Sequence, residues 1–368
     1  MRVLFIGPLP EPMTGQSLAC QVFHDALSKV SEVDVVNLNT AKLKSGFGSF
    51  GRALEVLVGV AKTFRLQGKS DIVYFTISES LAGNIKDIFT YIVCIRRLGR
   101  MIVHLHGGAG MRVLMRGRWG VLRWINSLFL RRVAAVIVLG QRHMDVFNGA
   151  APTGSLHIVP NFSPDDLFVN ESAIASKFEI CTPLRIIFVS NLIPGKGHEE
   201  LLAAFESLAP SLQDRIRIDF AGAFESENAR ESFLRAIKPH PQIAYRGVVK
   251  GDAKRRLFQG AHVFCLPTYY PYEGQPISIL EAYAAGCAVI TTDHSGIFDI
   301  FESERNGIAV AQRSPSSLAD AIAYAVGNPD VLKRQAITNL AAASAHYTER
   351  TYNQRLLEIV GQVAERKG

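Results

Sequence analysis

Short apolar strands alternate with longer helical segments along almost all of this 368-residue chain. The strand candidates are rich in valine, isoleucine and aromatic residues, and amphipathic helical patterns separate most of them. They lie at residues 3–6, 33–38, 72–75, 101–105, 135–138, 185–190, 217–221, 243–245, 261–266 and 288–291. Because strands joined through helices pair in parallel, this order predicts an α/β class built from doubly wound parallel sheets.

The length favours two domains, because a single hydrophobic core stops growing at about 250–300 residues. We expect a Rossmann-like domain over residues 1–165 and a second one over residues 166–348. A final helix over 349–368 is expected to pack back on the first domain, and a linker is expected within 163–183. Two such domains would face a central cleft with their strand ends, where open α/β sheets bind ligands.

The segment after the strand at 261–266 combines two carboxylates with the start of a helix. It reads Glu273-Gly-Gln-Pro-Ile-Ser-Ile-Leu-Glu281. Gly274 opens a turn and the helix starts near Pro276, which leaves backbone N–H groups without acceptors in the helix. Such an N-terminus favours an anion, most often a phosphate. Since the carboxylates can accept hydrogen bonds from hydroxyl groups, the segment predicts a ligand that joins a nucleotide diphosphate to a sugar.

Two glutamates also suggest glycoside hydrolysis, in which the carboxyl groups flank one bond at about 5 to 10 Å. Eight helical residues alone span about 12 Å, and a turn adds to the separation of Glu273 and Glu281. We therefore expect these glutamates to contact different parts of one long ligand, which disfavours a hydrolase.

A lysine between two glycines follows the strand at 185–190, in the loop Ser190-Asn-Leu-Ile-Pro-Gly-Lys-Gly197. Lys196 in such a strand-to-helix turn can reach a diphosphate as a point charge. The alternative is an ordinary exposed lysine, which the presence of the Glu273–Glu281 segment makes the less favoured interpretation.

The first strand ends in Gly7-Pro-Leu-Pro-Glu-Pro-Met-Thr-Gly-Gln16, before a helix expected over 17–27. Gly15 allows the backbone to approach a phosphate or sugar closely. The Gly-x-Gly-x-x-Gly pattern of dinucleotide-binding turns is absent. The alternative is a proline-rich connecting loop.

The strand at 101–105 runs into His106 and a pair of glycines. Alternation places His104 and His106 on one face, with His106 at the end where ligands bind. We expect His106 to contact a reacting sugar, with a buried structural histidine as the alternative. His104 is expected to be structural.

Together these motifs resemble the group 1 family of retaining glycosyltransferases, which have the GT-B fold. The resemblance covers nearly the whole chain and is strongest over residues 190–310. It implies that Glu273 and His106 are the catalytic residues at the donor sugar and that Glu281 contacts the ribose.

The resemblance also implies a set of residues that bind the diphosphate and the sugar of the donor. They are Gly15, Gln16, Asn191, Lys196, Gly274, Gln275, Pro276 and Ile277. The loop from Arg246 to Val249 resembles the family's nucleobase loop, which implies base recognition through the backbone of Gly247 and Val248.

One position departs from the family pattern. The family usually has an arginine five positions before the lysine, and this chain has Asn191 there. A neutral amide removes a positive charge from the diphosphate site, so Lys196 and the helix N-terminus must stabilise more of the developing charge.

The net charge of +7 is concentrated in one arginine-rich stretch at residues 96–132. Apolar residues, including Trp119 and Trp124, are interleaved with its arginines. Such a pattern is typical of a surface that binds anionic membranes. A solvated helix packed by its apolar stripe is the alternative, and nucleic acid is a third that no known motif supports.

The motifs and the resemblance predict a metal-independent glycosyltransferase that moves a sugar from a UDP- or GDP-sugar to a saccharide or lipid-linked saccharide in cell-surface glycan synthesis. The resemblance further implies that the anomeric configuration is retained. A nucleotide-sugar epimerase and a non-catalytic carbohydrate or membrane-surface module are the alternatives. No cofactor and no metal site are expected, because no Asp-x-Asp motif occurs. The five scattered cysteines and the lack of a signal peptide predict a cytoplasmic protein, peripheral on the inner membrane face.

Overall fold

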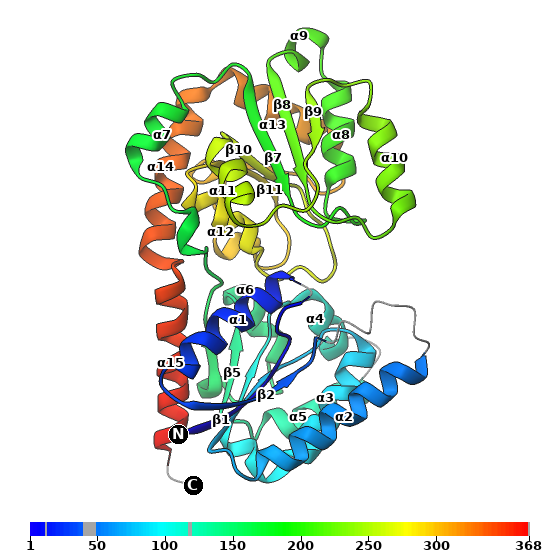
Figure 1. Cartoon of the computed structure of the whole chain (residues 1–368), viewed down its shortest axis with the longest axis vertical. Coiled ribbons are helices and arrows are strands. Elements are labelled where there is room, and N and C mark those ends of the chain that lie inside the picture. The colour runs from blue at the N-terminus through cyan, green and yellow to red at the C-terminus, as the bar shows by residue number, and fades with distance from the viewer. Residues whose placement is uncertain (12, 40–48, 117–119, 367–368) are drawn as a thin grey trace. The chain divides into compact units, whose positions relative to one another are not determined.

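The computed structural model describes residues 1–11, 13–39, 49–116 and 120–366. By their contacts these residues form two compact units (Figure 1). Unit 1 contains Met1–Asn161, Tyr272–Gln275 and Arg350–Gly368, and unit 2 contains Phe162–Pro271 and Pro276–Glu349. Nothing in the sequence pattern indicated that the short segment Tyr272–Gln275 groups with unit 1.

Unit 1 is built on a six-stranded parallel sheet in the order β2-β1-β3-β4-β5-β6. The strands are β1 (Arg2–Gly7), β2 (Glu32–Asn37), β3 (Ile72–Thr76), β4 (Met101–His104), β5 (Ala135–Val138) and β6 (Leu156–Ile158). Strands β1, β3, β4 and β5 are buried along nearly their whole length, as expected for a sheet covered on both faces. The neighbours of β1 are β2 on one side and β3 on the other, so the direction in which successive strands are added to the sheet reverses between β1 and β3.

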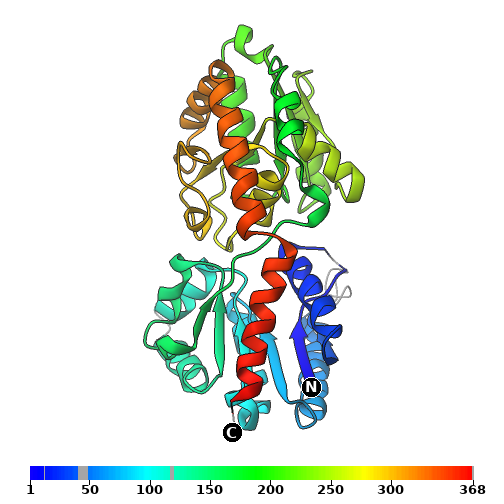
Figure 2. The ribbon, with the colours of Figure 1, turned by 90° about the vertical axis from the view of Figure 1, so that its left-hand side faces the viewer.

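Helices cover both faces of the unit 1 sheet. They are α1 (Gly15–Ser28), α2 (Ser49–Gln67), α3 (Leu81–Val93), η2 (Ile95–Arg100), α4 (Ala109–Arg116), α5 (Gly120–Leu130), α6 (Gln141–Met144), η3 (Asp145–Phe147), η4 (Thr153–Ser155) and α15 (Glu349–Glu365). Figure 2 shows α15 beside α1 on one side of the sheet. Its buried face carries Tyr352, Leu356, Ile359 and Val363, whose helical spacing makes one apolar stripe.

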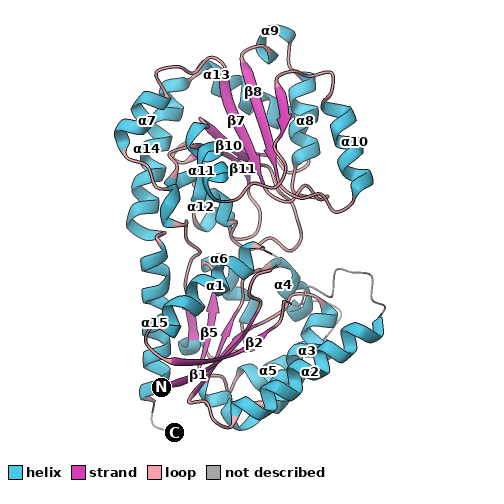
Figure 3. Ribbon diagram, viewed as in Figure 1, coloured by secondary structure: helices cyan, strands magenta, loops and turns pink. Residues whose placement is uncertain are grey.

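Unit 2 repeats the architecture with the strand order β12-β11-β10-β7-β8-β9, again parallel throughout (Figure 3). The strands are β7 (Leu184–Val189), β8 (Ile216–Ala221), β9 (Ile243–Tyr245), β10 (Val263–Leu266), β11 (Ala288–Thr292) and β12 (Gly307–Val310). Because β7 lies between β8 and β10, the direction of winding reverses between β7 and β10. Ligands of open parallel sheets bind at such switch points.

The unit 2 helices form two layers. They are η5 (Asp165–Leu167), α7 (Glu171–Lys177), α8 (His198–Ser207), α9 (Pro210–Gln213), α10 (Glu227–Ile237), α11 (Gly251–Gly260), α12 (Ile277–Ala284), η6 (Ile297–Asp299), α13 (Pro315–Gly327) and α14 (Pro329–His346). Helix α8 packs against α13, whereas α12 packs against α14. The α/β class with doubly wound parallel sheets is confirmed.

All ten expected strands are present, but two strands and one helix were not anticipated. Strand β6 is short and half-exposed, and β12 starts directly after the Asn306-Gly307 turn, so neither shows a clear strand pattern. The expected linker at 163–183 is wrong, because it contains helix α7 and places Leu167 and Ile174 in the core of unit 2.

Gly222 provides a test of how tightly the strand ends of unit 2 pack. Its φ is 148°, and a Cβ atom there would lie 1.8 Å from the carbonyl oxygen of Ser190 at the end of β7. We expect Gly222→Ala to lower the free energy of unfolding by about 2–4 kcal/mol in urea titrations. Gly327→Ala is the control, since no atom lies within 4 Å of its Cβ position. Equal midpoints for the two variants would contradict the expectation.

Candidate functional site

In unit 2, the loops that follow β7 and β10 meet at the switch point of the sheet. The backbone N–H of Tyr269 donates to the carbonyl oxygen of Gly195 at 2.7 Å, and Thr268 Oγ1 donates to the same oxygen at 3.2 Å. The β7 loop carries Lys196, and the β10 loop leads through Glu273 into α12. The two segments expected to bind a donor therefore leave neighbouring strands, and hydrogen bonds near Lys196 join their loops.

Lys196 is half-buried, and its ammonium group lies over the ring of Tyr270, with Nζ 4.7 Å from the ring centroid. A cation over an aromatic face is held by the ring quadrupole, which limits the positions the flexible side chain adopts. Asn191, five residues earlier in the same loop, is exposed. Tyr270 was not expected from the sequence, because nothing in its spacing marks it as a partner of this lysine.

Helix α12 begins at the carboxyl edge of the sheet with Pro276 as its N-cap. Pro276 provides no side-chain hydrogen bond to the first turn, and Ile277 is the first helical residue. The start of the helix therefore presents backbone N–H groups of its first turn without a side-chain cap, as the sequence predicts. This arrangement favours an anion at the N-terminus of α12.

Glu281 is 2% exposed and makes an ion pair with Lys254 of α11, with Nζ 2.5 Å from Oε1. The sequence predicted the carboxylate but missed Lys254, which looks like an ordinary surface lysine in the run Lys254-Arg255-Arg256. A buried carboxylate needs such a cation, because an unpaired charge is strongly disfavoured in the interior.

The expected nucleobase loop follows β9. Gly247 has a φ of 71°, and its carbonyl oxygen accepts from the N–H of Gly222 at 2.9 Å. The side chain of Val248 is exposed. The neighbouring Arg246 pairs with Asp219, with Nε 2.6 Å from Oδ1, so its guanidinium holds the loop on β8.

In unit 1, hydrogen bonds fix the segment Tyr272–Gln275. Gln275 is 3% exposed, and its Oε1 accepts from the N–H of Asn161 at 2.7 Å while its Nε2 donates to the carbonyl oxygen of Leu139 at 3.2 Å. Asn161 Nδ2 also donates to the carbonyl oxygen of Gln275 at 2.7 Å. The side chain of Gln275 thus holds the turn in place, a role that the sequence did not reveal.

Gly274 lies directly against the end of β4. A Cβ atom at this position would lie 2.4 Å from the carbonyl oxygen of His106 and 2.9 Å from Cα of Gly107. The structure therefore brings His106 close to the turn that carries the buried Glu273. These are the two residues that were expected to contact the sugar.

His106 is a neutral imidazole in this environment. Burial lowers its pKa to about 3, and its ring centroid lies 3.9 Å from that of His104. His106 Nε2 lies 4.0 Å from Sγ of Cys20 on α1. His104 is fully buried, and its Nδ1 lies 2.5 Å from the hydroxyl of Tyr74, so it has the structural role that was expected. A neutral His106 can donate or accept a hydrogen bond, but it cannot supply positive charge near neutral pH.

Gly15 and Gln16 form the first turn of α1, at the carboxyl end of β1. The N-cap Thr14 and Ser17 close this helix with a capping box, in which Thr14 Oγ1 accepts from the N–H of Ser17 at 3.1 Å. Gly15 is exposed and Gln16 is half-exposed. The expected proline-rich loop before them includes Pro12, which lies outside the described residues.

Several arginines of the stretch 96–132 bind backbone carbonyl groups of their own unit. Arg97 donates to Gly68 at 2.9 Å, Arg123 to Asn148 at 3.2 Å and Arg131 to Gly149 at 3.3 Å. Arg118 and Trp119 lie outside the described residues. Within the part of the chain that the structure describes, no helix has both the length and the apolar character needed to cross a membrane.

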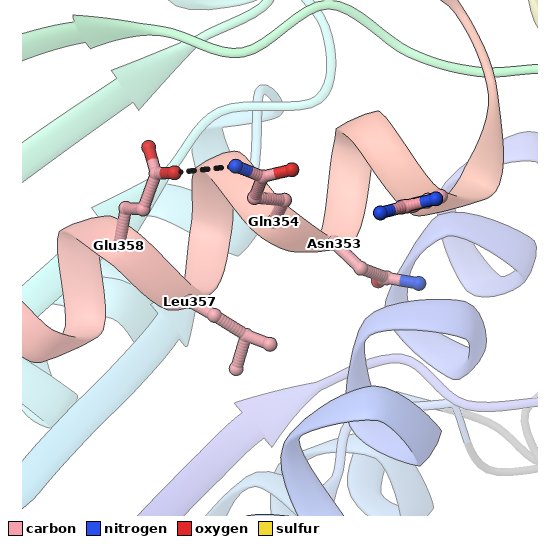
Figure 4. A pocket seen from close by; sticks show the side chains of 5 residues that line it. Asn353, Gln354, Leu357 and Glu358 are labelled. Atoms are coloured by element: carbon pink, nitrogen blue, oxygen red, sulfur yellow. Dashed lines mark hydrogen bonds between the residues drawn. The ribbon is translucent and has the colours of Figure 1, made fainter.

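Two further features concern the residues that the structure describes. No group of three or more His, Cys, Asp or Glu side chains that could hold a metal ion occurs among them. A hollow of about 520 Å³ runs along α15 and is lined by Arg350, Asn353, Gln354, Leu357 and Glu358 (Figure 4). Gln354 Nε2 donates to Glu358 Oε1 at 2.9 Å there. No residue expected to bind the donor lines this hollow.

Residues 171–344 match the family model described as glycosyl transferases group 1. An uncharacterized glycosyltransferase of Methanocaldococcus jannaschii is 31% identical over 136 residues, which make up 36% of this chain and 33% of the relative. The N,N'-diacetylbacillosaminyl-diphospho-undecaprenol alpha-1,3-N-acetylgalactosaminyltransferase of Campylobacter jejuni is 24% identical over 180 residues, or 48% of this chain and 44% of the relative. The chain thus spans less than half the length of these curated relatives.

Among solved structures, the Anabaena protein HepE in complex with UDP-glucose has a TM-score of 0.74. The match covers 98% of this chain and 100% of HepE at 17% identity. This likeness and the two six-stranded parallel sheets confirm the expected GT-B fold.

The ion pair between Lys254 and Glu281 generates a stability prediction. We expect Lys254→Met to lower the free energy of unfolding by about 2–4 kcal/mol, because it leaves a buried carboxylate without its cation. Adding Glu281→Gln should restore part of that loss, since the charge is then gone. Lys238→Met, at an exposed lysine at the end of α10, is the control. If Lys254→Met and Lys238→Met have the same urea midpoint, the pair does not stabilise unit 2.

Proposed function

We propose that this chain, whose residues 171–344 match the family model described as glycosyl transferases group 1, transfers a sugar from a nucleotide-diphosphate sugar to a saccharide or lipid-linked saccharide. The observation that carries the proposal is the switch point of unit 2. There, the loop that carries Lys196 and the loop that leads to α12 follow adjacent strands. The N-terminus of α12 has no side-chain cap, and the buried Glu281 lies in α12. A cation, backbone N–H groups and a carboxylate together suit a diphosphate joined to a ribose.

The chemistry assigned to unit 2 is stabilisation of the leaving nucleotide diphosphate. Negative charge develops on the leaving phosphate as the bond to the sugar breaks. Lys196 and the N–H groups at Ile277 would donate to it, and each such donor is worth about 2–4 kcal/mol by analogy with oxyanion holes. Glu281 would accept from the ribose hydroxyls.

The residues assigned to the sugar are Glu273 and His106. The carboxylate of Glu273 would accept hydrogen bonds from sugar hydroxyls, and the neutral imidazole of His106 would contact the sugar as it reacts. Because burial lowers the pKa of His106 to about 3, its imidazole adds no positive charge at the phosphate near neutral pH. Gly15 and Gln16 at the start of α1 are proposed to lie near the donor phosphate or sugar.

The finer features of the reaction are also proposals. We assign the reaction to the retaining class because the motifs of this chain resemble retaining enzymes. We expect it to need no divalent metal, because Lys196 and the α12 N-terminus would supply the positive potential. Activity that persists in EDTA, with product of unchanged anomeric configuration by NMR, would support both.

The donor is proposed to be a UDP- or GDP-sugar, bound through the nucleobase at the backbone of Gly247 and Val248. One structural neighbour was solved with UDP-glucose, and the Campylobacter relative is named for transfer to a diphospho-undecaprenol acceptor. These names support a nucleotide-sugar donor and a glycan acceptor in cell-surface synthesis.

Donor binding and turnover test the proposal directly. Among UDP-, GDP- and ADP-sugars, we expect one donor to raise Tm strongly, because only a ligand of the native state stabilises it.

Lys196→Ala should lower kcat by about 100- to 1,000-fold, since it removes a donor to the leaving phosphate. Glu273→Gln should lower turnover without preventing nucleotide binding. Acceptor-dependent release of UDP or GDP is the measurement.

Lys238→Ala is the matched control for these variants, because it removes an exposed lysine of unit 2 at the end of α10, a helix to which no donor contact is assigned. A Lys196→Ala enzyme as active as Lys238→Ala would contradict the assignment of the diphosphate site. Interconversion of the donor without an acceptor would indicate an epimerase instead.

We further propose that unit 1 docks on an anionic bilayer through α2, α3 and α5, which are neighbours in the structure (Figure 1). We call their exposed apolar side chains the apolar face. It comprises Leu57, Val58, Phe64, Leu81, Ile85, Phe89, Ile92, Val121, Trp124 and Leu128. Phe64 is 65% exposed and Trp124 is 63% exposed, which is unusual for such large apolar side chains.

Exposed cations lie on the same elements and around them. They are Lys62, Arg65, Lys69, Arg96, Arg123, Arg131 and Arg132. Each basic residue near an anionic surface contributes about 1 kcal/mol to binding, and aromatic side chains can enter the headgroup region. The apolar face with this basic surround fits the inner face of the cytoplasmic membrane, where we propose that the protein is peripheral and cytoplasmic.

Vesicle flotation tests the apolar face. We expect the protein to float with vesicles that contain anionic phosphatidylglycerol at low salt, and to remain in solution with neutral vesicles. Replacing Phe89 and Trp124 together by serine should weaken binding at least tenfold, because two aromatic side chains no longer enter the interface. Tyr324→Ser, at an exposed aromatic residue in unit 2, is the control. Wild-type protein that ignores anionic vesicles at low salt would contradict the proposal.

A further inference from the structure

Glu79 is a partly buried carboxylate beside the sugar-binding turn, and the sequence patterns did not single it out. It lies between β3 and α3, at the carboxyl edge of the unit 1 sheet. Its Oε1 accepts from the N–H of Met111 at 3.4 Å, and the N–H groups of Gly108 and Gly110 also donate to the carboxylate. The side chain therefore caps the N-terminus of α4, although it belongs to a distant part of the chain.

The Glu79 carboxylate fills the space beside Gly107. A Cβ atom on Gly107 would lie 1.6 Å from Oε2 of Glu79, so no other residue fits there without a shift. On Gly110, a Cβ atom would lie 2.8 Å from Cβ of Glu79 and 2.9 Å from Cδ1 of Tyr272. The carboxylate thus supports the turn from Gly107 to Met111 over its whole length.

The same turn supports the segment that carries Glu273. As described above, Gly274 lies directly against His106 and Gly107. The Glu79 carboxylate thus lies against Gly107, and Gly107 lies against Gly274. A shift of any one of these residues would require the next to move. Removing the support at Glu79 should release both the Gly107–Met111 turn and the Tyr272–Gln275 segment.

The charges around Glu79 oppose its ionisation. Burial is the main reason why its pKa is raised to about 7, and the nearby Glu273 raises it further, whereas the three backbone N–H groups lower it. His106, next to Gly107, is neutral, and Tyr272 faces Gly110. None of the groups that act on the pKa of Glu79 is a cation. The influences on the pKa of Glu79 thus combine burial and a second carboxylate, which oppose its ionisation, with backbone N–H groups, which favour it.

We propose that Glu79 is a positioning residue, whose carboxylate holds the Gly107–Met111 turn against Gly274 and so sets the position of Glu273. This inference rests on the proposed function only for the role of Glu273, because the positioning itself can be measured without any ligand. The ionised carboxylate accepts from all three N–H groups, whereas an amide of the same shape presents an NH₂ group to some of them. Glu79→Gln should therefore loosen the turn, and Glu79→Asp should partly restore it.

Amide hydrogen exchange of the full-length protein at pH 8 tests the positioning. In Glu79→Gln, we expect faster exchange in both the Gly107–Met111 turn and the Tyr272–Gln275 segment, with Glu79→Asp between it and the wild type. Glu365→Gln, at an exposed glutamate at the end of α15, is the control and should exchange like the wild type. If Tyr272–Gln275 keeps its wild-type exchange in Glu79→Gln, the proposal is overturned.

The pH profile of donor turnover supplies the functional arm. The pKa of Glu79 is raised in the native state, so the ionised fraction increases as pH rises through about 7. We expect wild-type kcat to fall towards the level of Glu79→Gln as pH drops through about 7, and to level off above that value. Glu79→Gln should show a flat profile and a kcat lower by about 10- to 100-fold, with the donor KM within threefold.

The two failures are distinguishable. A wild-type protein without turnover of any donor would refute the proposed function, while hydrogen exchange would still decide the positioning role. An active wild type whose pH profile and kcat are unchanged in Glu79→Gln would refute the positioning role and leave the proposed function standing.

Discussion

At the carboxyl edge of each sheet, backbone segments of the same unit lie so close together that several positions have no room for a Cβ atom. In unit 1, Gly274 lies against the carbonyl oxygen of His106, and in unit 2, Gly222 lies against that of Ser190. Such contacts join main chain to main chain, so the side chains of the candidate site extend from a backbone that cannot shift independently. Packing at interior density resists small displacements, which gives the site a defined geometry without a bound ligand.

The two buried carboxylates of the donor segment are stabilised in different ways. Glu281 has a cation, Lys254, at hydrogen-bonding distance, so its charge is offset before any ligand arrives. Glu273 lies near Glu79, a second carboxylate whose pKa is raised by burial and then by the charge of Glu273. An arrangement that costs stability is typical of functional sites rather than of structural ones. This difference agrees with a holding role for Glu281 and a role nearer the reacting sugar for Glu273.

The sequence predicted the sheets and the donor motifs because both depend on local patterns. Buried parallel strands such as β3 and β10 are nearly continuous apolar runs, and the N-terminus of α12 is marked by Gly274 and Pro276. Contacts between distant segments leave no such signal. Lys254 pairs with Glu281 from another helix, and Glu79 supports a turn about thirty residues later in the chain. The edge strands β6 and β12 were missed because they are short, with three and four residues.

We expect the neutral Asn191 to weaken the proposed diphosphate site less than the loss of one charge suggests. An isolated lysine is flexible and strongly hydrated, so much of its potential is lost to motion and solvent. Here, Lys196 is half-buried and its ammonium group is held over the ring of Tyr270, which restricts the side chain and removes part of its water. One cation held in place in a less polar environment interacts more strongly with a phosphate than the same cation in water. Tyr270 therefore offsets part of what an arginine at position 191 would have supplied, through the placement of Lys196 rather than through charge of its own.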